Sequence, residues 1–326
     1  MKALERSDRL TIPGVTIGHG SDLVGKTGVS VVLCPEGATA AAEVRGTATG
    51  TRQFDSLNRV HHVATRAHAV VLSGGSGYGL ASADPVVRWL AERGHGFDTG
   101  VRVVPLVPTA ILFDLAFGDP EAVPSRELVE EALATASDGP QASGSLGAGT
   151  GATVGKALGP ESGMKGGIGF ASVSVPEGPT VAALVAVNAF GDVRDPATGD
   201  LLAGCRTTVD SRDLADAANV MAHLESDALH PWQGNTTLAV VMTDAALDKP
   251  GARKVSEMAF GAFYRCFSPA LSVFDGDLIV TLASGLVPAH VHQIGVLAES
   301  VVAEAIGRAV TEADGFGIVP AVRDLK

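Results

Sequence analysis

Residues 230–247 read HPWQGNTTLAVVMTDAAL and contain a clear strand signal. From Thr237 to Thr243 the side chains are mostly apolar or β-branched, which is typical of a strand buried in a core. Gly234 and Asn235, directly before this run, are residues that favour turns. The simplest interpretation is a loop that leads into a central strand.

The rest of the chain alternates between strand and helix patterns. Strands are expected within residues 28–37, 101–115, 180–204 (two strands joined by a turn at 195–199), 236–243 and 276–283. Helices are expected within residues 125–137, 250–266 and 298–310. Residues 68–94 are expected to form a strand, a glycine loop and a helix. No stretch resembles a flexible linker between domains. The pattern therefore predicts one domain of mixed α/β layers that spans residues 1–326.

Composition and charge exclude several classes of protein. The 326 residues carry 24 basic and 36 acidic side chains without a basic cluster, so a nucleic-acid partner is not expected. The first residues lack the apolar run of a signal peptide, and no segment of 18 apolar residues predicts a membrane span. Cys34, Cys205 and Cys266 are odd in number and widely spaced, which indicates reduced thiols in a cytoplasmic protein.

Two glycine loops invite a nucleotide-binding interpretation, but neither completes the pattern. Residues 75–80 read GSGYGL and lack the last glycine of a dinucleotide-binding loop. Gly155 and Lys156 are followed by Ala157, where a phosphate-binding loop needs Ser or Thr. We therefore expect no nucleotide cofactor.

A few polar residues stand out in apolar or glycine-rich surroundings. Asp275 and Asp277 are two residues apart at the start of a strand, so both carboxylates lie on one side of the chain. Asn188 ends an apolar run, where its amide needs hydrogen-bond partners. Taken singly, each has an ordinary interpretation: a solvated acidic turn, a strand-terminal Asn, and a surface position for Lys156.

The bond between Asn235 and Thr236 has a second interpretation, as a peptide bond that the protein cuts itself. Thr236 would then become an N-terminus that carries a hydroxyl nucleophile and an α-amine base. These residues alone favour the loop over the cleavage site, and the decision depends on the rest of the chain.

Seven blocks in this order resemble one family. They are IPGVTIGH (12–19), VVLSGGSGYGL (70–80), GAGTGATVGK (147–156), GGIGFASV (166–173), VAVNAFGDV (185–193), GNTTLAVVMTDAALDK (234–249) and FDGD (274–277). The chain is similar over nearly its whole length to the self-processing L-aminopeptidase/D-esterase family, which includes β-peptidyl aminopeptidases and the 6-aminohexanoate-oligomer (nylon-oligomer) endohydrolase.

The resemblance implies a fold, a cleavage and a set of site residues. The fold is an α/β four-layer α/β/β/α sandwich like that of the N-terminal-nucleophile hydrolases. Self-cleavage between Asn235 and Thr236 would leave chains 1–235 and 236–326, which assemble as a homo-oligomer. The family's catalytic roles carry over to Thr236, Tyr78, Lys156, Asn188 and the acidic pair Asp275 and Asp277.

Three functions follow from this resemblance. An aminopeptidase that acts on short peptides or aminoacyl amides and esters fits most of the blocks. A threonine nucleophile at position 236 instead matches the endo-acting amidases of nylon oligomers. A third alternative is an unprocessed, inert relative that acts as a binding protein.

The implied chemistry needs neither metal nor cofactor. In the precursor, the Thr236 hydroxyl attacks the Asn235 carbonyl, an N-to-O acyl shift forms an ester, and water cleaves it. The exposed α-amine, with an ordinary pKa of about 7.7–8.0, then serves as base near neutral pH.

The other site residues would assist in substrate hydrolysis. Asn188 Nδ2 would donate to the oxyanion, and Tyr78 would add a second donor or position the substrate. The acidic pair would orient Thr236. Lys156 would lower the pKa of the amine, or would be the base itself; the sequence leaves both roles open.

Overall fold

The computed structural model describes residues 3–223 and 234–325, and its central feature is a 10-stranded sheet. The strand order is β1-β11-β12-β15-β17-β3-β5-β8-β4, and β2 pairs with β3. The strands are β1 (Glu5–Ser7), β2 (Thr16–Asp22), β3 (Thr27–Val44), β4 (Thr51–Arg52), β5 (Arg66–Ser73), β8 (Thr109–Ile111), β11 (Gly167–Ser174), β12 (Thr180–Asn188), β15 (Thr236–Ala245) and β17 (Leu278–Val287).

The long strand β3 divides this sheet into two facing halves. Its first part, up to Leu33, pairs with β2 and β5, and its last part, from Thr39, pairs with β17. The pairing with β5 shifts between Leu33 and Ala38, where the strand changes direction between the two halves. One apolar cluster contains buried side chains from both halves, among them Val32, Leu72, Phe170, Leu184 and Val240.

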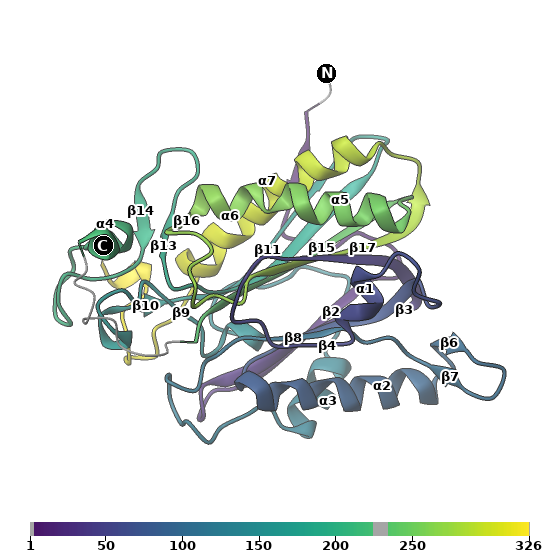
Figure 1. The fold of residues 1–326 in the computed structure, drawn as a ribbon, viewed down its shortest axis with the longest axis horizontal. Helices are drawn as coiled ribbons and strands as arrows, with labels where there is room; N and C mark the ends of the chain where they lie inside the picture. Colours follow the sequence, from purple (N-terminus) through teal and green to yellow (C-terminus); the bar gives the residue numbers. More distant parts are fainter. Residues whose placement is uncertain (1–2, 224–233, 326) are drawn as a thin grey trace.

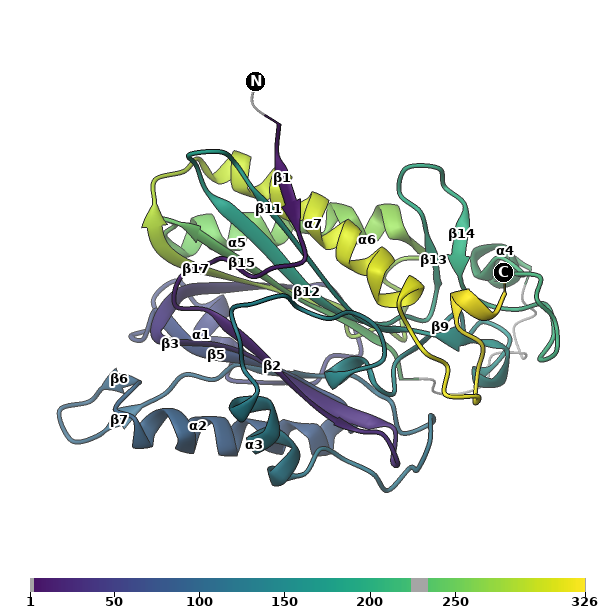
Figure 2. The same ribbon diagram turned by 180° about the vertical axis from the view of Figure 1, so that it is seen from behind.

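Helices cover the two outer faces. On one side lie α5 (Lys249–Ala259) and α7 (Val291–Thr311), and on the other lie α2 (Ala83–Glu92) and α3 (Arg126–Ala134) (Figures 1 and 2). Each helix pair has its own apolar cluster against the sheet half that it covers. The predicted four-layer α/β/β/α sandwich is confirmed.

Several element boundaries differ from the sequence-based expectation. The helix expected over 250–266 is two helices, α5 and α6 (Gly261–Cys266), with a turn at Phe260 between them. Helix α7 begins at Val291, seven residues before the expected start. The segment 180–204 forms three strands, since the predicted turn at 195–199 joins β13 (Asp192–Arg194) to β14 (Leu201–Ala203).

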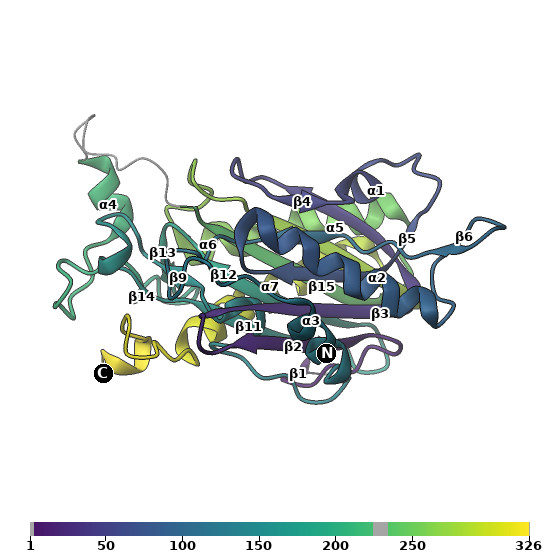
Figure 3. The same cartoon turned by 90° about the horizontal axis from the view of Figure 1, so that it is seen from below.

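Shorter elements complete the chain. They are α1 (Phe54–Asn58), α4 (Ala217–Ala222), β6 (Phe97–Asp98), β7 (Val103–Val104), β9 (Thr153–Val154), β10 (Met164–Lys165), β16 (Phe267–Ser268), and the 3-10 helices η1 (Ser76–Ser82), η2 (Gly147–Gly149), η3 (Pro160–Ser162) and η4 (Val322–Asp324). Figure 3 shows α4, β9, β13 and β14 gathered at the end of the molecule that also holds the C-terminus. Residues 230–233 of the opening stretch lie outside the described residues.

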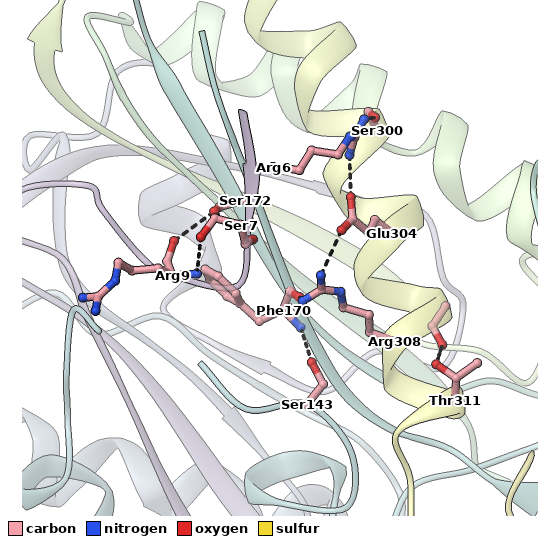
Figure 4. Close-up of polar contacts among 11 residues, drawn as sticks. Arg6, Ser7, Arg9, Ser143, Phe170, Ser172, Ser300, Glu304, Arg308 and Thr311 are labelled. Atoms are coloured by element: carbon pink, nitrogen blue, oxygen red, sulfur yellow. Dashed lines mark hydrogen bonds and ion pairs between the residues drawn. The ribbon is translucent and has the colours of Figure 1, made fainter. Parts of the chain in front are cut away.

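Polar contacts tie the N-terminal strand to the C-terminal helix (Figure 4). Arg6 of β1 forms an ion pair with Glu304 and donates to Ser300 Oγ at 2.7 Å, both on α7. Arg308 of α7 donates to the Phe170 carbonyl of β11 at 3.4 Å and lies 3.3 Å from Glu304. Segments from both ends of the chain are therefore joined across one layer boundary.

Two further observations concern the cysteines and the helices. Cys34, Cys205 and Cys266 are buried free thiols. Within residues 3–223 and 234–325, none of the helices combines the length and apolar character that a bilayer crossing requires.

Candidate active site

Three neighbouring strands bring the predicted polar residues together. Asn188 is the last residue of β12 and pairs with Thr236, the first residue of β15. On the other side of β15, Asn235 forms a parallel bridge with Asp275, just before β17. Asn188, Asn235, Thr236 and Asp275 are each at most 2% exposed. Strand order alone thus places residues from three distant blocks in one buried cluster.

The acidic pair is buried, so the solvated turn favoured by its sequence in isolation is wrong. Backbone N–H groups of residues 45–48 donate to the carbonyls of Asp275 and Asp277 and hold this loop against the sheet. Asp277 Oδ1 accepts from the Thr237 N–H at 2.6 Å, and Asp275 Oδ1 accepts from the Phe190 N–H at 3.1 Å. Both carboxylates therefore anchor backbone at the start of β15 and the end of β12.

Lys156 is also buried, although its glycine-rich setting is typical of a surface lysine. Its Nζ donates to Asn235 Oδ1 at 2.6 Å and to Asn188 Oδ1 at 2.9 Å. Asn188 Oδ1 also accepts from the Thr153 N–H at 3.0 Å, and Asn188 Nδ2 donates to the Phe113 carbonyl at 2.8 Å. These partners fix the orientation of the Asn188 amide, with one of its two N–H bonds engaged by Phe113.

The Thr236 hydroxyl lies directly against the carbonyl of the residue before it. Thr236 Oγ1 donates to the Asn235 oxygen, which also accepts from the Gly276 N–H at 3.1 Å. A Cβ at position 276 would lie 2.6 Å from Thr236 Oγ1 and 2.5 Å from the Ala48 oxygen. Only glycine therefore permits this close approach of backbone and hydroxyl.

Burial changes the proton affinities in the cluster. It lowers the pKa of Lys156 from its ordinary 10.5 to about 7, and the nearby Asp275 carboxylate opposes this shift. Burial also raises the pKa of Asp275, and it raises the pKa of Asp277 well above its usual range with the charge of Asp275 adding to the effect. The lysine can therefore exchange a proton near neutral pH.

Tyr78 is the one candidate that the structure does not bring into this cluster. It lies in η1, is 73% exposed, and makes no hydrogen bond to the cluster within the part of the chain that the structure describes. The backbone is left-handed at Gly75 and at Ser76, the first residue of η1, and η1 buries Gly79 and leaves Tyr78 at the surface.

Two buried charged residues next to the cluster have no counterpart among the sequence-based candidates. Asp114 accepts from Thr27 Oγ1 at 2.8 Å and from the Gly75 N–H at 2.7 Å, and burial raises its pKa to about 6. Lys165 Nζ donates to the carbonyls of Gly149 and Ala152, and burial lowers its pKa to about 7. In the sequence, these two residues differ from their neighbours only as charged residues among apolar or glycine residues. Many structural residues share that pattern, so it does not identify a functional residue.

A cavity of about 820 Å³ opens beside the cluster. Gly234, Thr153 and Lys156 form part of its wall, so it borders the residue before Asn235 and the lysine of the cluster. Its charged lining residues are Asp114, Lys156, Glu161, Arg206, Asp210 and Asp324. This volume is in the range of small-ligand sites. Among the residues with described positions, no group of three or more His, Cys, Asp or Glu side chains is arranged to hold a metal ion.

Sequence comparison identifies relatives along almost the whole chain. Residues 9–321 match the model of peptidase family S58. An uncharacterized aminopeptidase of Mycobacterium leprae is 34% identical over 340 residues, which cover 95% of this chain and 91% of the relative. A 6-aminohexanoate-oligomer endohydrolase of Kocuria sp. is 27% identical over 281 residues, which cover 85% of this chain and 74% of that enzyme.

Solved structures share the fold at lower identity. A β-aminopeptidase of Burkholderia sp. superimposes with a TM-score of 0.71 at 20% identity and covers 100% of this chain and 94% of its own. The L-aminopeptidase D-Ala-esterase/amidase of Ochrobactrum anthropi, described as a variant of the Ntn hydrolase fold, has a TM-score of 0.68 at 17% identity and covers 98% and 92%. The family resemblance seen in the seven sequence blocks is confirmed. Because the family model spans nearly the whole chain and a relative of 34% identity covers 95% of it, this chain belongs to peptidase family S58 and is an aminopeptidase-like hydrolase.

Proposed function

We propose that this protein is a self-processing amide hydrolase with an N-terminal threonine nucleophile. It cuts the Asn235–Thr236 bond and then acts as an aminopeptidase on short peptides or aminoacyl amides and esters. One observation carries the proposal: the Thr236 hydroxyl lies against the Asn235 carbonyl, inside a buried cluster whose lysine has a pKa of about 7.

Self-cleavage begins with attack of Thr236 Oγ1 on the Asn235 carbonyl carbon. The hydroxyl proton passes to a base, the C–N bond breaks, and the Thr236 nitrogen takes up a proton as the ester forms. Water then hydrolyses the ester to a carboxylate at Asn235 and a free Thr236. The position of the Thr236 hydroxyl next to the Asn235 carbonyl would supply proximity. The Gly276 N–H, which donates to the Asn235 oxygen at 3.1 Å, would stabilise the oxyanion.

The base for self-cleavage differs from the base available afterwards. In the uncut chain the Thr236 nitrogen is an amide, so it has no basic lone pair. Lys156 is the nearby amine that burial shifts toward its neutral form. After cleavage the Thr236 α-amine can take over this role, and the second N–H of Asn188 Nδ2 can donate to the substrate oxyanion. The acidic pair keeps the start of β15 in place.

The cavity supports an aminopeptidase preference. Four carboxyl groups, those of Asp114, Glu161, Asp210 and Asp324, are among its lining residues, against the guanidinium of Arg206 and the amine of Lys156. Such a lining favours a substrate with a free ammonium group over a capped one. Endo-hydrolysis of 6-aminohexanoate oligomers is the second candidate, because relatives with that activity are 27% identical.

Intact mass spectrometry tests the proposal directly. Purified wild-type protein is expected as two polypeptides, 1–235 and 236–326, and Thr236→Ala as one full-length chain. We also expect the processed protomers to form a homo-oligomer, which light scattering would measure. A wild-type protein that stays full length after long incubation would contradict self-processing and favour an inert binding protein.

A further inference from the structure

The Asn235 side chain makes a contact that the chemistry of self-cleavage does not by itself require. Asn235 Oδ1 accepts from Lys156 Nζ at 2.6 Å, the shorter of the two contacts that this amine makes with side-chain amides. The residue whose carbonyl would be attacked is thus tied, through its own side chain, to the amine proposed as the base.

The geometry of a neutral amine gives this contact a consequence. A neutral lysine amine has two N–H donors and one lone pair. Asn235 Oδ1 and Asn188 Oδ1 are two acceptors within 2.9 Å of Nζ, and the Asn188 backbone carbonyl is a third, more distant one at 3.5 Å, so the two short contacts can occupy both donors. The direction of the lone pair is then set by two amide oxygens, one of which belongs to the residue to be cut.

The backbone of Asn235 is held as firmly as its side chain. Its N–H donates to the Phe274 carbonyl at 3.3 Å, and its own carbonyl accepts from the Gly276 N–H at 3.1 Å. The residue is 1% exposed. The N–H, the carbonyl and the side chain of Asn235 therefore all form hydrogen bonds. Because the residue is held in this way, its side chain fixes the position of the Lys156 amine relative to the peptide bond to be cut.

We infer that Asn235 is a positioning residue for self-cleavage, and that its side chain holds Lys156 at the bond to be cut without a role in the later hydrolysis of substrates. This inference rests on the proposed self-cleavage. After the cut, Asn235 is the last residue of one polypeptide and Thr236 the first of the other. A substrate brings its own acyl group, so nothing in its hydrolysis calls for the Asn235 amide.

The first test compares rates of self-cleavage in the full-length chain. Asn235→Ala should cleave about 10- to 100-fold more slowly than wild type, the range expected when one hydrogen bond to a charged or partly charged group is lost. Thr237→Val is the matched control. Thr237 is fully buried two residues along, and its Oγ1 has no hydrogen-bond partner among the described residues, so this variant should cleave at the wild-type rate.

The second measurement separates processing from catalysis. Asn235→Ala is incubated until cleavage is complete, and amide hydrolysis is then measured per cut protomer. The expected activity equals that of wild type. An Asn235→Ala protein that cleaves as fast as wild type, or whose cut form has lost activity in proportion to its slower processing, would overturn the inference.

The Asn235→Asp variant tests the inference through the pH dependence of self-cleavage, which would not change if Asn235 had only a structural role. The variant has nearly the same shape and places a carboxylate beside the Lys156 amine, which favours the ammonium form. The pH at which self-cleavage reaches half its maximal rate should therefore move upward relative to wild type, with a rate at high pH above that of Asn235→Ala. An unchanged pH profile would overturn the inference, and this variant also carries the test if Asn235→Ala does not fold. Failure of the proposed function would look different, since wild type itself would then remain uncut.

Discussion

At the scale of single residues, burial decides the chemistry of Lys156. A lysine in water is an ammonium ion at neutral pH and cannot accept a proton. In this cluster the cost of removing that charge from water lowers the pKa to about 7, while Asp275 limits the change. Asn188 and Asn235 supply neutral acceptors that suit either protonation state. The residue type is common, and its environment makes it a candidate base.

This pKa predicts the pH dependence of self-cleavage. Below pH 7 Lys156 is mainly an ammonium ion without a lone pair, and above pH 7 it is mainly neutral. The rate of self-cleavage should therefore rise with pH and level off above about pH 8. Denaturing electrophoresis of samples quenched at intervals between pH 5.5 and 9 measures it. A rate that is constant or falls across this range would exclude Lys156 as the base.

At the scale of elements, the junction before β17 positions the reacting peptide. Residues 45–48, which follow β3, hold the Asp275–Asp277 loop through backbone hydrogen bonds. That loop in turn places the Gly276 N–H on the Asn235 carbonyl. The geometry at the start of β15 is therefore built by two segments far from it in sequence.

Gly276→Ala should disrupt this junction. The new Cβ would lie 2.6 Å from Thr236 Oγ1 and 2.5 Å from the Ala48 oxygen, so backbone or hydroxyl must move. We expect self-cleavage to be lost and the free energy of unfolding to fall by about 1–3 kcal/mol. Gly307→Ala is the control, because a Cβ at that position on α7 meets nothing within 4 Å. Mass spectrometry and thermal unfolding report the two effects; wild-type cleavage by Gly276→Ala would refute the arrangement.

At the scale of the whole molecule, the expected cut divides one sheet between two polypeptides. Strand β15, from the second piece, lies between β12 of the first piece and β17 of the second, and β17 pairs with β3 of the first. Helix α7 of the second piece is tied to β1 and β11 of the first by Arg6 and Arg308. Neither piece contains a complete core.

The two pieces should therefore stay together without a disulfide. The β15 side chains Leu238, Val240, Val241 and Met242 are fully buried, and exposure of each would cost roughly 1.5–3 kcal/mol. Gel filtration under reducing conditions should show both pieces in one peak, and denaturant should separate them. Separation in native buffer would contradict the single shared core.

The cavity leads to a prediction about substrates. Its carboxylates should favour a substrate ammonium group, so free-amine aminoacyl amides should be cleaved at least ~10-fold faster in kcat/KM than their N-acetyl forms, about 1.4 kcal/mol of differential transition-state binding. Paired rates on one chromogenic amide measure this difference. Equal rates, or faster cleavage of the capped form, would favour endo-hydrolysis.

Local patterns determined much of the fold. The apolar run after Thr236 is a central strand, Ser125 caps α3 through the Leu128 N–H, and the strand-helix alternation agrees with the layered sandwich. Such signals depend on residues a few positions apart, so they can be recognised in a single sequence. Seven short blocks also indicated the family and five of the residues that meet in the cluster.

Only the tertiary structure decided how those residues meet. The change of direction in β3 places its two ends in different half-sheets, and the strand order sets Asn188, Thr236 and Asp275 side by side. The same packing buries Lys156 and the acidic pair, which their local sequence assigns to the surface, and leaves Tyr78 exposed. Burial and pKa depend on contacts between segments far apart in the chain, and no short stretch of sequence contains that information.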